Sequence, residues 1–167
     1  MKKYELTEET VTVYGKTLYR IRAVRDFGSV KTGEFGGYIE KEENLSHFGN
    51  AWVSGNAWVF DNARVYDNAW VFGNAKVYGD AWVSGNAEVF NTRHFFVQGP
   101  IGSRNGFITF YRTKDNTVEV RCGCFSGSLQ KFVDRVEETH GGSRYEKEYK
   151  LAAELAKVCI RLEGESR

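Results

Sequence analysis

The sequence predicts a mainly β protein in which a parallel β-helix lies between an N-terminal β-hairpin cap and a small C-terminal α+β domain. A six-residue motif that recurs through the middle of the chain predicts the β-helix. Alternating patterns around a turn predict the cap, and two amphipathic helix patterns predict the α+β domain. We expect the cap at residues 1–38, the repeats at residues 39–98 and the α+β domain at residues 99–167.

The composition is that of a globular protein with nearly balanced charge. The 167 residues are 41% hydrophobic and 27% charged, and 23 basic and 22 acidic side chains give a net charge of +1. DNA binding by counterion release needs a strongly basic surface, so we do not expect a nucleic-acid partner. No apolar run approaches the roughly 20 residues of a membrane span. Three cysteines and no export signal at the start predict a cytoplasmic protein.

The predicted cap is a hairpin near the start of the chain. Residues 11–14 and 18–24 have strand patterns, and Gly15 and Lys16 between them form the turn. Arg20, Arg22 and Arg25 alternate or nearly so, which gives the hairpin a basic edge. We interpret this edge as a solvated strand face.

The repeat occupies the chain from Asn50 to Phe90. It reads NAWVSG, NAWVFD, NARVYD, NAWVFG, NAKVYG, DAWVSG and NAEVF. Alanine holds the second position and valine the fourth in all of these units, with larger side chains between them. This is strand alternation, with alanine and valine inside, and the Gly/Asp–Asn pair supplies a bend. Each unit therefore predicts one short strand and one corner.

This pattern resembles the hexapeptide-repeat family. The resemblance implies a left-handed β-helix with three strands in each turn of about eighteen residues. More narrowly, residues 36–46 (GGYIEKEENLS) running into the repeats resemble hypothetical proteins common in phage and prophage genomes, over roughly residues 1–98. The resemblance implies a phage-encoded protein, and the family's habit predicts a trimer.

Bulky rings fill the outward positions of the repeats. At a spacing of eighteen we expect Trp52 to stack under Trp70, Phe60 under Tyr78, and Phe72 under Phe90. Stacked rings can simply stabilise parallel strands, but so much aromatic surface is rarely left wet in a monomer. We therefore expect burial against sister chains or against the chain's own ends. The candidate oligomer interface comprises Trp52, Trp58, Trp70, Trp82, Phe72 and Phe90.

The C-terminal third has a different pattern. Residues 107–111 and 117–125 read as two strands. Leu129, Phe132, Val133 and Val136 follow helical spacing up to Gly141 and Gly142. Ser143 and Glu146 form a capping box for a final helix. One face of that helix carries Tyr145, Tyr149, Ala152, Leu155, Ala156 and Cys159.

The sequence offers little evidence for a set of residues that could form a catalytic or metal site. Acyl transfer is the commonest activity among hexapeptide-repeat enzymes, which usually carry a catalytic histidine and a loop extruded from the repeats, whereas these repeats are uninterrupted. His47 reads as a packing residue, and His47, His94 and His140 are too scattered for the three-histidine zinc site of carbonic anhydrases of that fold. Cys122 and Cys124 read as core residues without a second pair. We expect no catalytic residue, metal or cofactor.

An anion site is the sharpest local hypothesis. Residues 121–129 (RCGCFSGSL) predict a strand, a Gly/Ser turn and a helix that begins at Ser128. Free amides at a helix start attract anions, although ordinary capping by Ser128 explains the same residues. The candidate ligands of the anion are Arg121, Ser126, Gly127 and Ser128, joined by Ser103 and Arg104 from the preceding turn.

Three functions from different classes follow. The first is a non-catalytic oligomeric binding protein that sequesters a small nucleotide-type anion or blocks a host defence protein, as an anti-CRISPR protein does. The second is a hexapeptide acyltransferase with a degenerate site. The third is a structural or virion-associated protein. We favour the first, with a homo-oligomer and a nucleotide-type molecule or a host defence protein as partners.

Overall fold

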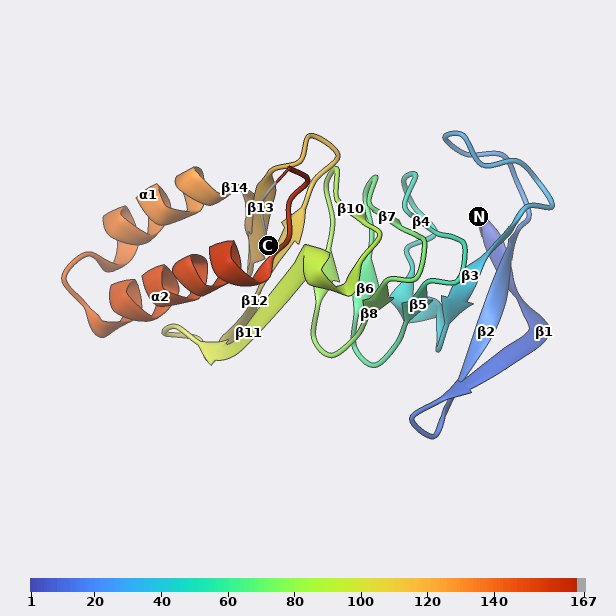
Figure 1. The fold of residues 1–167 in the computed structure, drawn as a ribbon, viewed down its shortest axis with the longest axis horizontal. Coiled ribbons are helices and arrows are strands. Elements are labelled where there is room, and N and C mark those ends of the chain that lie inside the picture. Colours follow the sequence, from blue (N-terminus) through green and yellow to red (C-terminus); the bar gives the residue numbers. More distant parts are fainter. Residues whose placement is uncertain (165–167) are drawn as a thin grey trace. The chain divides into compact units, whose positions relative to one another are not determined.

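A computed structural model describes residues 1–164 of the chain. The chain divides into two compact units, Met1–Thr92 and Arg93–Arg167. Figure 1 shows the order of the elements in both units. The division comes after Thr92, where we expected the repeats to continue to residue 98. No helix in the described range is long and apolar enough to cross a membrane.

The first unit begins with the predicted hairpin. Strand β1 (Tyr4–Val13) pairs antiparallel with β2 (Lys16–Ala23). The register shifts between Leu6 and Thr10, so β1 pairs in two segments separated by an irregularity. Strand β3 (Phe35–Ile39) then pairs with β2. The hairpin prediction is confirmed, but the turn consists of Tyr14 and Gly15, where we expected Gly15 and Lys16.

The repeats follow β3 and the short 3₁₀ helix η1 (Glu42–Asn44). Each repeat forms a strand of two residues, and partners in parallel pairs lie eighteen residues apart, as in Trp52↔Trp70 and Val71↔Val89. The alanine and valine columns are buried throughout. The predicted eighteen-residue stacking and the inward columns are therefore confirmed. These strands are β4 (Trp52–Val53), β5 (Trp58–Val59), β6 (Arg64–Val65), β7 (Trp70–Val71), β8 (Lys76–Val77), β9 (Trp82–Val83) and β10 (Glu88–Val89).

The predicted fold class, a left-handed parallel β-helix of hexapeptide repeats, is wrong. The strands of the whole described chain fall into four separate small sheets of five, three, four and two strands, none of them closed or solenoid-like. The physical reason lies in the corners, where residues such as Asp61 and Asp67 adopt φ 58°. Only two residues of each six remain extended, which is too few to join neighbouring ladders into one continuous sheet.

The second unit is a four-stranded antiparallel sheet with two helices, where we expected two strands. Its strands are β11 (Phe95–Ile101), β12 (Gly106–Arg112), β13 (Val118–Cys122) and β14 (Phe125–Ser128), in that order across the sheet. The predicted strand at residues 117–125 is broken by a turn at Gly123 and Cys124. Helices α1 (Leu129–His140) and α2 (Arg144–Cys159) confirm the two helix predictions.

The core of the second unit lies between one face of its sheet and both helices. Phe110 and Val120 from the sheet pack in one cluster with Phe132 of α1 and Ala152 and Ala156 of α2. Rings meet edge to face, since the centroids of Phe110 and Phe132 are 6.1 Å apart at 89°. Leu155, expected on the inner face of α2, is instead exposed.

Candidate functional site

The candidate site is an aromatic surface of the first unit with a lysine beside it. The eighteen-residue stacking places Phe60 and Tyr78 one above the other, with ring centroids 5.3 Å apart and planes at 16°. Phe60 is buried with Val13 and Leu18 of the hairpin. Tyr78 is 45% exposed. Tyr78 is therefore the exposed ring of the pair, and Phe60, on which it stacks, is packed against the hairpin.

Lys76 lies in the adjacent outward row. Its Nζ is 4.5 Å from the centroid of the Trp58 ring. Parallel hydrogen bonding continues just past the end of β8, since the N–H of Trp58 donates to Ala75 and that of Phe60 to Val77, so Lys76 and Tyr78 flank the buried Val77 on one face. The ring of Tyr14, at the hairpin turn, lies 6.2 Å from that of Phe60. We call Tyr14, Trp58, Phe60, Lys76 and Tyr78 the Tyr78 surface.

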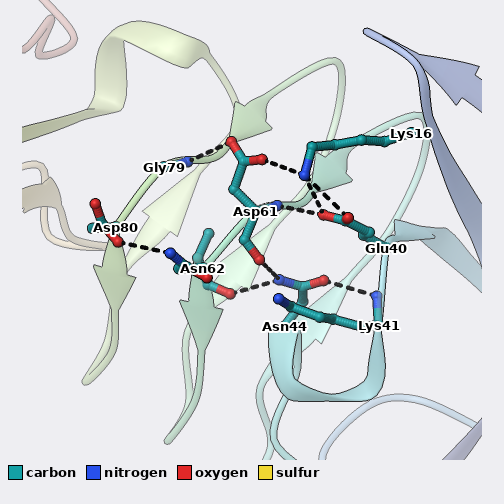
Figure 2. A network of polar contacts seen from close by, with 9 residues as sticks. Lys16, Glu40, Lys41, Asn44, Asp61, Asn62, Gly79 and Asp80 are labelled. Carbon is teal, nitrogen blue, oxygen red and sulfur yellow. Dashed lines mark hydrogen bonds and ion pairs between the residues drawn. The ribbon is translucent and has the colours of Figure 1, made fainter.

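Figure 2 shows a polar network around Asp61. Lys16 Nζ lies 2.7 Å from Asp61 Oδ1 and 3.1 Å from Glu40 Oε1. The backbone N–H of Asp61 donates to Glu40 Oε2 at 2.7 Å, and that of Gly79 donates to Asp61 Oδ2 at 3.2 Å. Asp61 follows Phe60 and Gly79 follows Tyr78, so these contacts fix the backbone that carries the stacked rings.

Asn44 extends the network to η1. Its buried amide donates to the carbonyl oxygens of Asp61, at 3.2 Å, and Ala63, at 2.8 Å. Its carbonyl accepts from the backbone N–H of Lys41 at 2.9 Å. The buried side chain of Asn44 thus makes three hydrogen bonds and fixes the backbone of the corner at Asp61.

The network is charged at neutral pH. The hydrogen bond from Lys16 holds the pKa of Asp61 below its usual value. Asp61 first, and then Glu40, raise the pKa of Lys16. Lys16 is therefore neutralised by its own carboxylates, whereas Lys76 forms no ion pair among residues 1–164. Lys76 is the cation that the Tyr78 surface offers to a ligand.

The six residues expected at an oligomer interface differ in exposure. Trp52 is only 2% exposed, because Tyr4 and Phe27 of the same chain cover it. Trp82 is 37% exposed, with the Arg64 guanidinium 5.5 Å from its ring centroid. The remaining members, Trp58, Trp70, Phe72 and Phe90, are half-buried. Of the expected ring pairs, Phe72 and Phe90 lie 5.0 Å apart.

The residues of the expected anion site lie in the second unit. Arg121 and Ser126 are direct partners across β13 and β14, so their side chains share one face. Gly127 belongs to β14 and pairs with Val120. The Ser126–Gly127 segment is thus a strand, where we expected a turn with free amides.

The remaining members of that site lie at the end of β14 and in the turn between β11 and β12. Ser128 caps α1, since its side chain accepts the backbone N–H of Lys131. Ser103 and Arg104 lie in the turn between β11 and β12, next to Gly102, whose N–H donates to Glu148 of α2 at 2.9 Å. Anion binding around Arg121 stays a prediction.

The histidines and cysteines lie in separate environments. His47 stacks on Tyr4, with centroids 4.2 Å apart. Burial, and then the charge of Arg112, lowers the pKa of His94 to about 4. Cys122 packs against the core of the second unit and Cys124 is exposed in the hairpin turn, so the prediction of a shared core face is wrong for Cys124. No group of three potential metal ligands lies together in the described part.

Sequence reasoning missed Lys76 and the network around Asp61. Lys76 takes the column position that tryptophan holds in four other repeats, and counting eighteen residues back places it beside Trp58. Glu40 precedes the repeats, and only the fold brings it to Asp61. Comparison with protein-family models gave no match, and comparison with curated proteins gave none.

Proposed function

We propose that this protein is a non-catalytic binding protein that takes a nucleotide-type anion on the Tyr78 surface. One observation carries the proposal: a half-exposed ring, stacked on a buried one, has an ammonium group without an ion pair on the same face. A base can stack on Tyr78 because every base has a flat π face. A phosphate can then contact Lys76.

Magnitudes set the expected affinity. One stacked base contributes about 1–3 kcal/mol, and one charge-assisted hydrogen bond contributes about 1.5–3 kcal/mol. Together these correspond to a dissociation constant on the order of a millimolar. Much tighter binding would mean that further groups contact the ligand. Sequestration of a scarce ligand would therefore require more than the Tyr78 surface of one chain.

The test is a titration with a cyclic mononucleotide and with ADP-ribose, followed by ligand-observed NMR. We expect Tyr78→Ala to abolish binding and Tyr78→Phe to retain it, because only the ring stacks. Lys76→Met should weaken binding and remove most of its salt dependence. Phe107→Ala, which removes a ring that is 44% exposed in the second unit, is the matched control and should bind normally.

The same titration separates this surface from the residues around Arg121. Binding that survives Tyr78→Ala but is lost in Arg121→Met would contradict the proposal and place the ligand on the sheet of the second unit. If neither nucleotide binds to the unmodified protein, the hypothesis of a nucleotide-type ligand is wrong.

Other parts of the functional hypothesis remain proposals. Self-association is one of them, and the mass in solution by light scattering tests it. Blocking of a host defence protein is another. A cytoplasmic location fits the three free cysteines, Cys122, Cys124 and Cys159.

A further inference from the structure

The N-terminal end of the first unit buries a positive charge. Lys3 is 0% exposed, and its ammonium donates to the carbonyl oxygens of Ala51, at 2.6 Å, Gly49, at 3.4 Å, and Phe48, at 3.5 Å. It also lies 4.8 Å from the centroid of the Phe27 ring. The contacts that the structure describes for this ammonium are carbonyl oxygens and a ring, and none is a carboxylate. Burial of such a charge is costly.

The groups around Lys3 add to this cost. The charged and titratable groups that face the cluster are Lys2 and Tyr4 from the same segment, Arg25 from the loop after β2, Glu42 and Glu43 from η1, and His47 from the loop before β4. Arg25 has the same charge as Lys3. Within the described residues, the buried atoms Arg25 Nε and His47 Nε2 have no hydrogen-bond partner, although His47 Nε2 lies 3.6 Å from Glu42 Oε2. Buried polar atoms without partners lower local stability.

The same segment covers a tryptophan. Tyr4 stacks on His47 and donates to the carbonyl oxygen of Leu45 at 2.8 Å. Its ring lies 6.4 Å from that of Trp52, edge to face. Trp52 is in register with Trp70 in the next strand of its sheet. Removal of Tyr4 would therefore uncover one side of Trp52, while Phe27, whose ring centroid lies 5.2 Å away, still covers another.

The segment joins the rest of β1 at a register shift. Tyr4, Glu5 and Leu6 pair with residues 21–23 of β2, and pairing resumes only at Thr10 after the register shift. The unpaired stretch at residues 7–9 separates the first part of β1 from the part that forms the hairpin. The register shift therefore divides the β1–β2 pairing into one part at residues 4–6 and another at residues 10–13.

We propose that residues 1–6 form an acid-opened strap over Trp52, because the docked strap buries the Lys3 ammonium against carbonyl oxygens and the Phe27 ring, with no carboxylate among its described contacts. Opening hydrates the ammonium and frees Arg25 and His47 to bind water. It also uncovers the side of the Trp52 ring that Tyr4 packs against, so the strap controls how much of this ring other molecules can reach.

The direction of the pH dependence follows from proton linkage. Burial, and then the charge of Arg25, lowers the pKa of Lys3 in the docked strap to about 8 from 10.5. Burial also lowers the pKa of His47, against the opposing effect of Glu42. Both groups bind protons more tightly when the strap is open, so opening increases as the pH falls. For Lys3 alone, the open fraction should rise about tenfold between pH 9 and pH 7.

Hydrogen exchange followed by mass spectrometry tests the strap in the unmodified protein. After correction for intrinsic rates, residues 4–6 should exchange about tenfold faster at pH 7 than at pH 9. Residues 10–13 should show no such change. Equal changes in both segments would mean that the whole hairpin opens, and no change in residues 4–6 would overturn the proposal.

Variants identify the groups responsible. Lys3→Met removes the charge at nearly constant length and should abolish the change between pH 9 and pH 7. Lys2→Met, which removes an exposed lysine paired with Glu42, should retain it. His47→Gln should keep this change and lose any further rise below pH 7. An unchanged pH profile in Lys3→Met would exclude Lys3 as the sensor.

A fluorescence measurement reports on Trp52 itself. In a variant with Trp58, Trp70 and Trp82 replaced by phenylalanine, Trp52 is the remaining tryptophan. Its quenching by acrylamide should increase as the pH falls from 9 to 7. Quenching that stays constant while residues 4–6 lose protection would show that the strap opens without exposing Trp52.

Discussion

The carboxylate of Asp61 does two things at one corner of the repeats. It accepts the N–H of Gly79, eighteen residues on, and it pairs with Lys16 of the hairpin. Asp67 occupies the equivalent place at the next corner, with the same φ of 58° and a hydrogen bond from Gly85. The side chains of Asp61 and Asp67 thus make the same hydrogen bond, and Asp61 also pairs with Lys16. Asp67 is therefore a natural control for Asp61.

We expect Asp61→Asn to destabilise the first unit more than Asp67→Asn does. Asparagine tolerates the left-handed backbone angle, so the substitution removes charge without strain. The ion pair is partly exposed, so the difference should be below about 1 kcal/mol in chemical denaturation at pH 7. Equal losses in the two variants would show that Lys16 contributes nothing through Asp61.

This difference should also depend on pH with a definite sign. The pKa of Asp61 in the folded protein is lowered from 3.8, so its contribution is fully present above the unfolded value. It should be lost as the pH falls from about 3.8 through the lowered folded value. Denaturation at pH 7 and at successively lower pH, on both asparagine variants, measures the loss.

At the scale of the element, each repeat is defined by its corner as much as by its strand. Gly49 and Gly79 both adopt positive φ, of 67° and 68°. A Cβ at Gly49 would lie 2.5 Å from the carbonyl oxygen of Asp67, whereas a Cβ at Gly79 would meet nothing within 4 Å. Glycine is therefore favoured at position 79 by the backbone angle alone. At position 49 it is favoured by the backbone angle and by the close approach of the Asp67 carbonyl.

Alanine at these two positions should separate the demands. Gly79→Ala should cost about 1–2 kcal/mol, which is the price of a left-handed angle for a residue with a Cβ. Gly49→Ala should cost clearly more, since the neighbouring backbone must also move. Thermal unfolding of both variants measures the two costs, and equal values would mean that the backbone at Asp67 yields freely.

The sequence predicts some of these elements well and others poorly, for physical reasons. The alanine and valine columns predict one short buried strand in each six residues because their period is strict, whereas the eighteen-residue pairing is an implication of the resemblance to hexapeptide repeats. The extent of each strand could not be predicted, since Asp61 and Asp67 leave only two extended residues between corners. The alternation of apolar side chains predicts a strand that continues from Val118 past Gly123, but the chain turns at Gly123. The site depends on Glu40 meeting Asp61, and no local pattern encodes that contact.

At the scale of the whole molecule, the two units have separate cores. Valine and alanine columns fill the first, whereas Phe132 lies at the centre of the second, in contact with Phe110, Phe125 and Tyr149. Compact units with their own cores commonly unfold as separate cooperative units.

Phe132→Ala tests this separation. The ring is 4% exposed, so its loss should destabilise the second unit by about 3–5 kcal/mol. Hydrogen exchange should then accelerate in residues 93–164, while residues 1–92 keep their protection. A matching loss of protection in the repeats would show that the two units unfold together. Phe107→Ala, at a half-exposed ring of the same unit, should have a much smaller effect.

The eighteen-residue pairing also restricts how the repeats can change in length. Phe60 meets Tyr78, Asn62 meets Asp80 and Asp61 meets Gly79 at the same offset. Duplication of one complete eighteen-residue block preserves each of these meetings, whereas duplication of a single hexapeptide sends every later residue to a different neighbour. Insertions and deletions compatible with this architecture therefore comprise three hexapeptides, or a multiple of three. A gene lengthened by one hexapeptide would encode a chain in which the tryptophans and corner aspartates no longer lie next to the residues that they contact here.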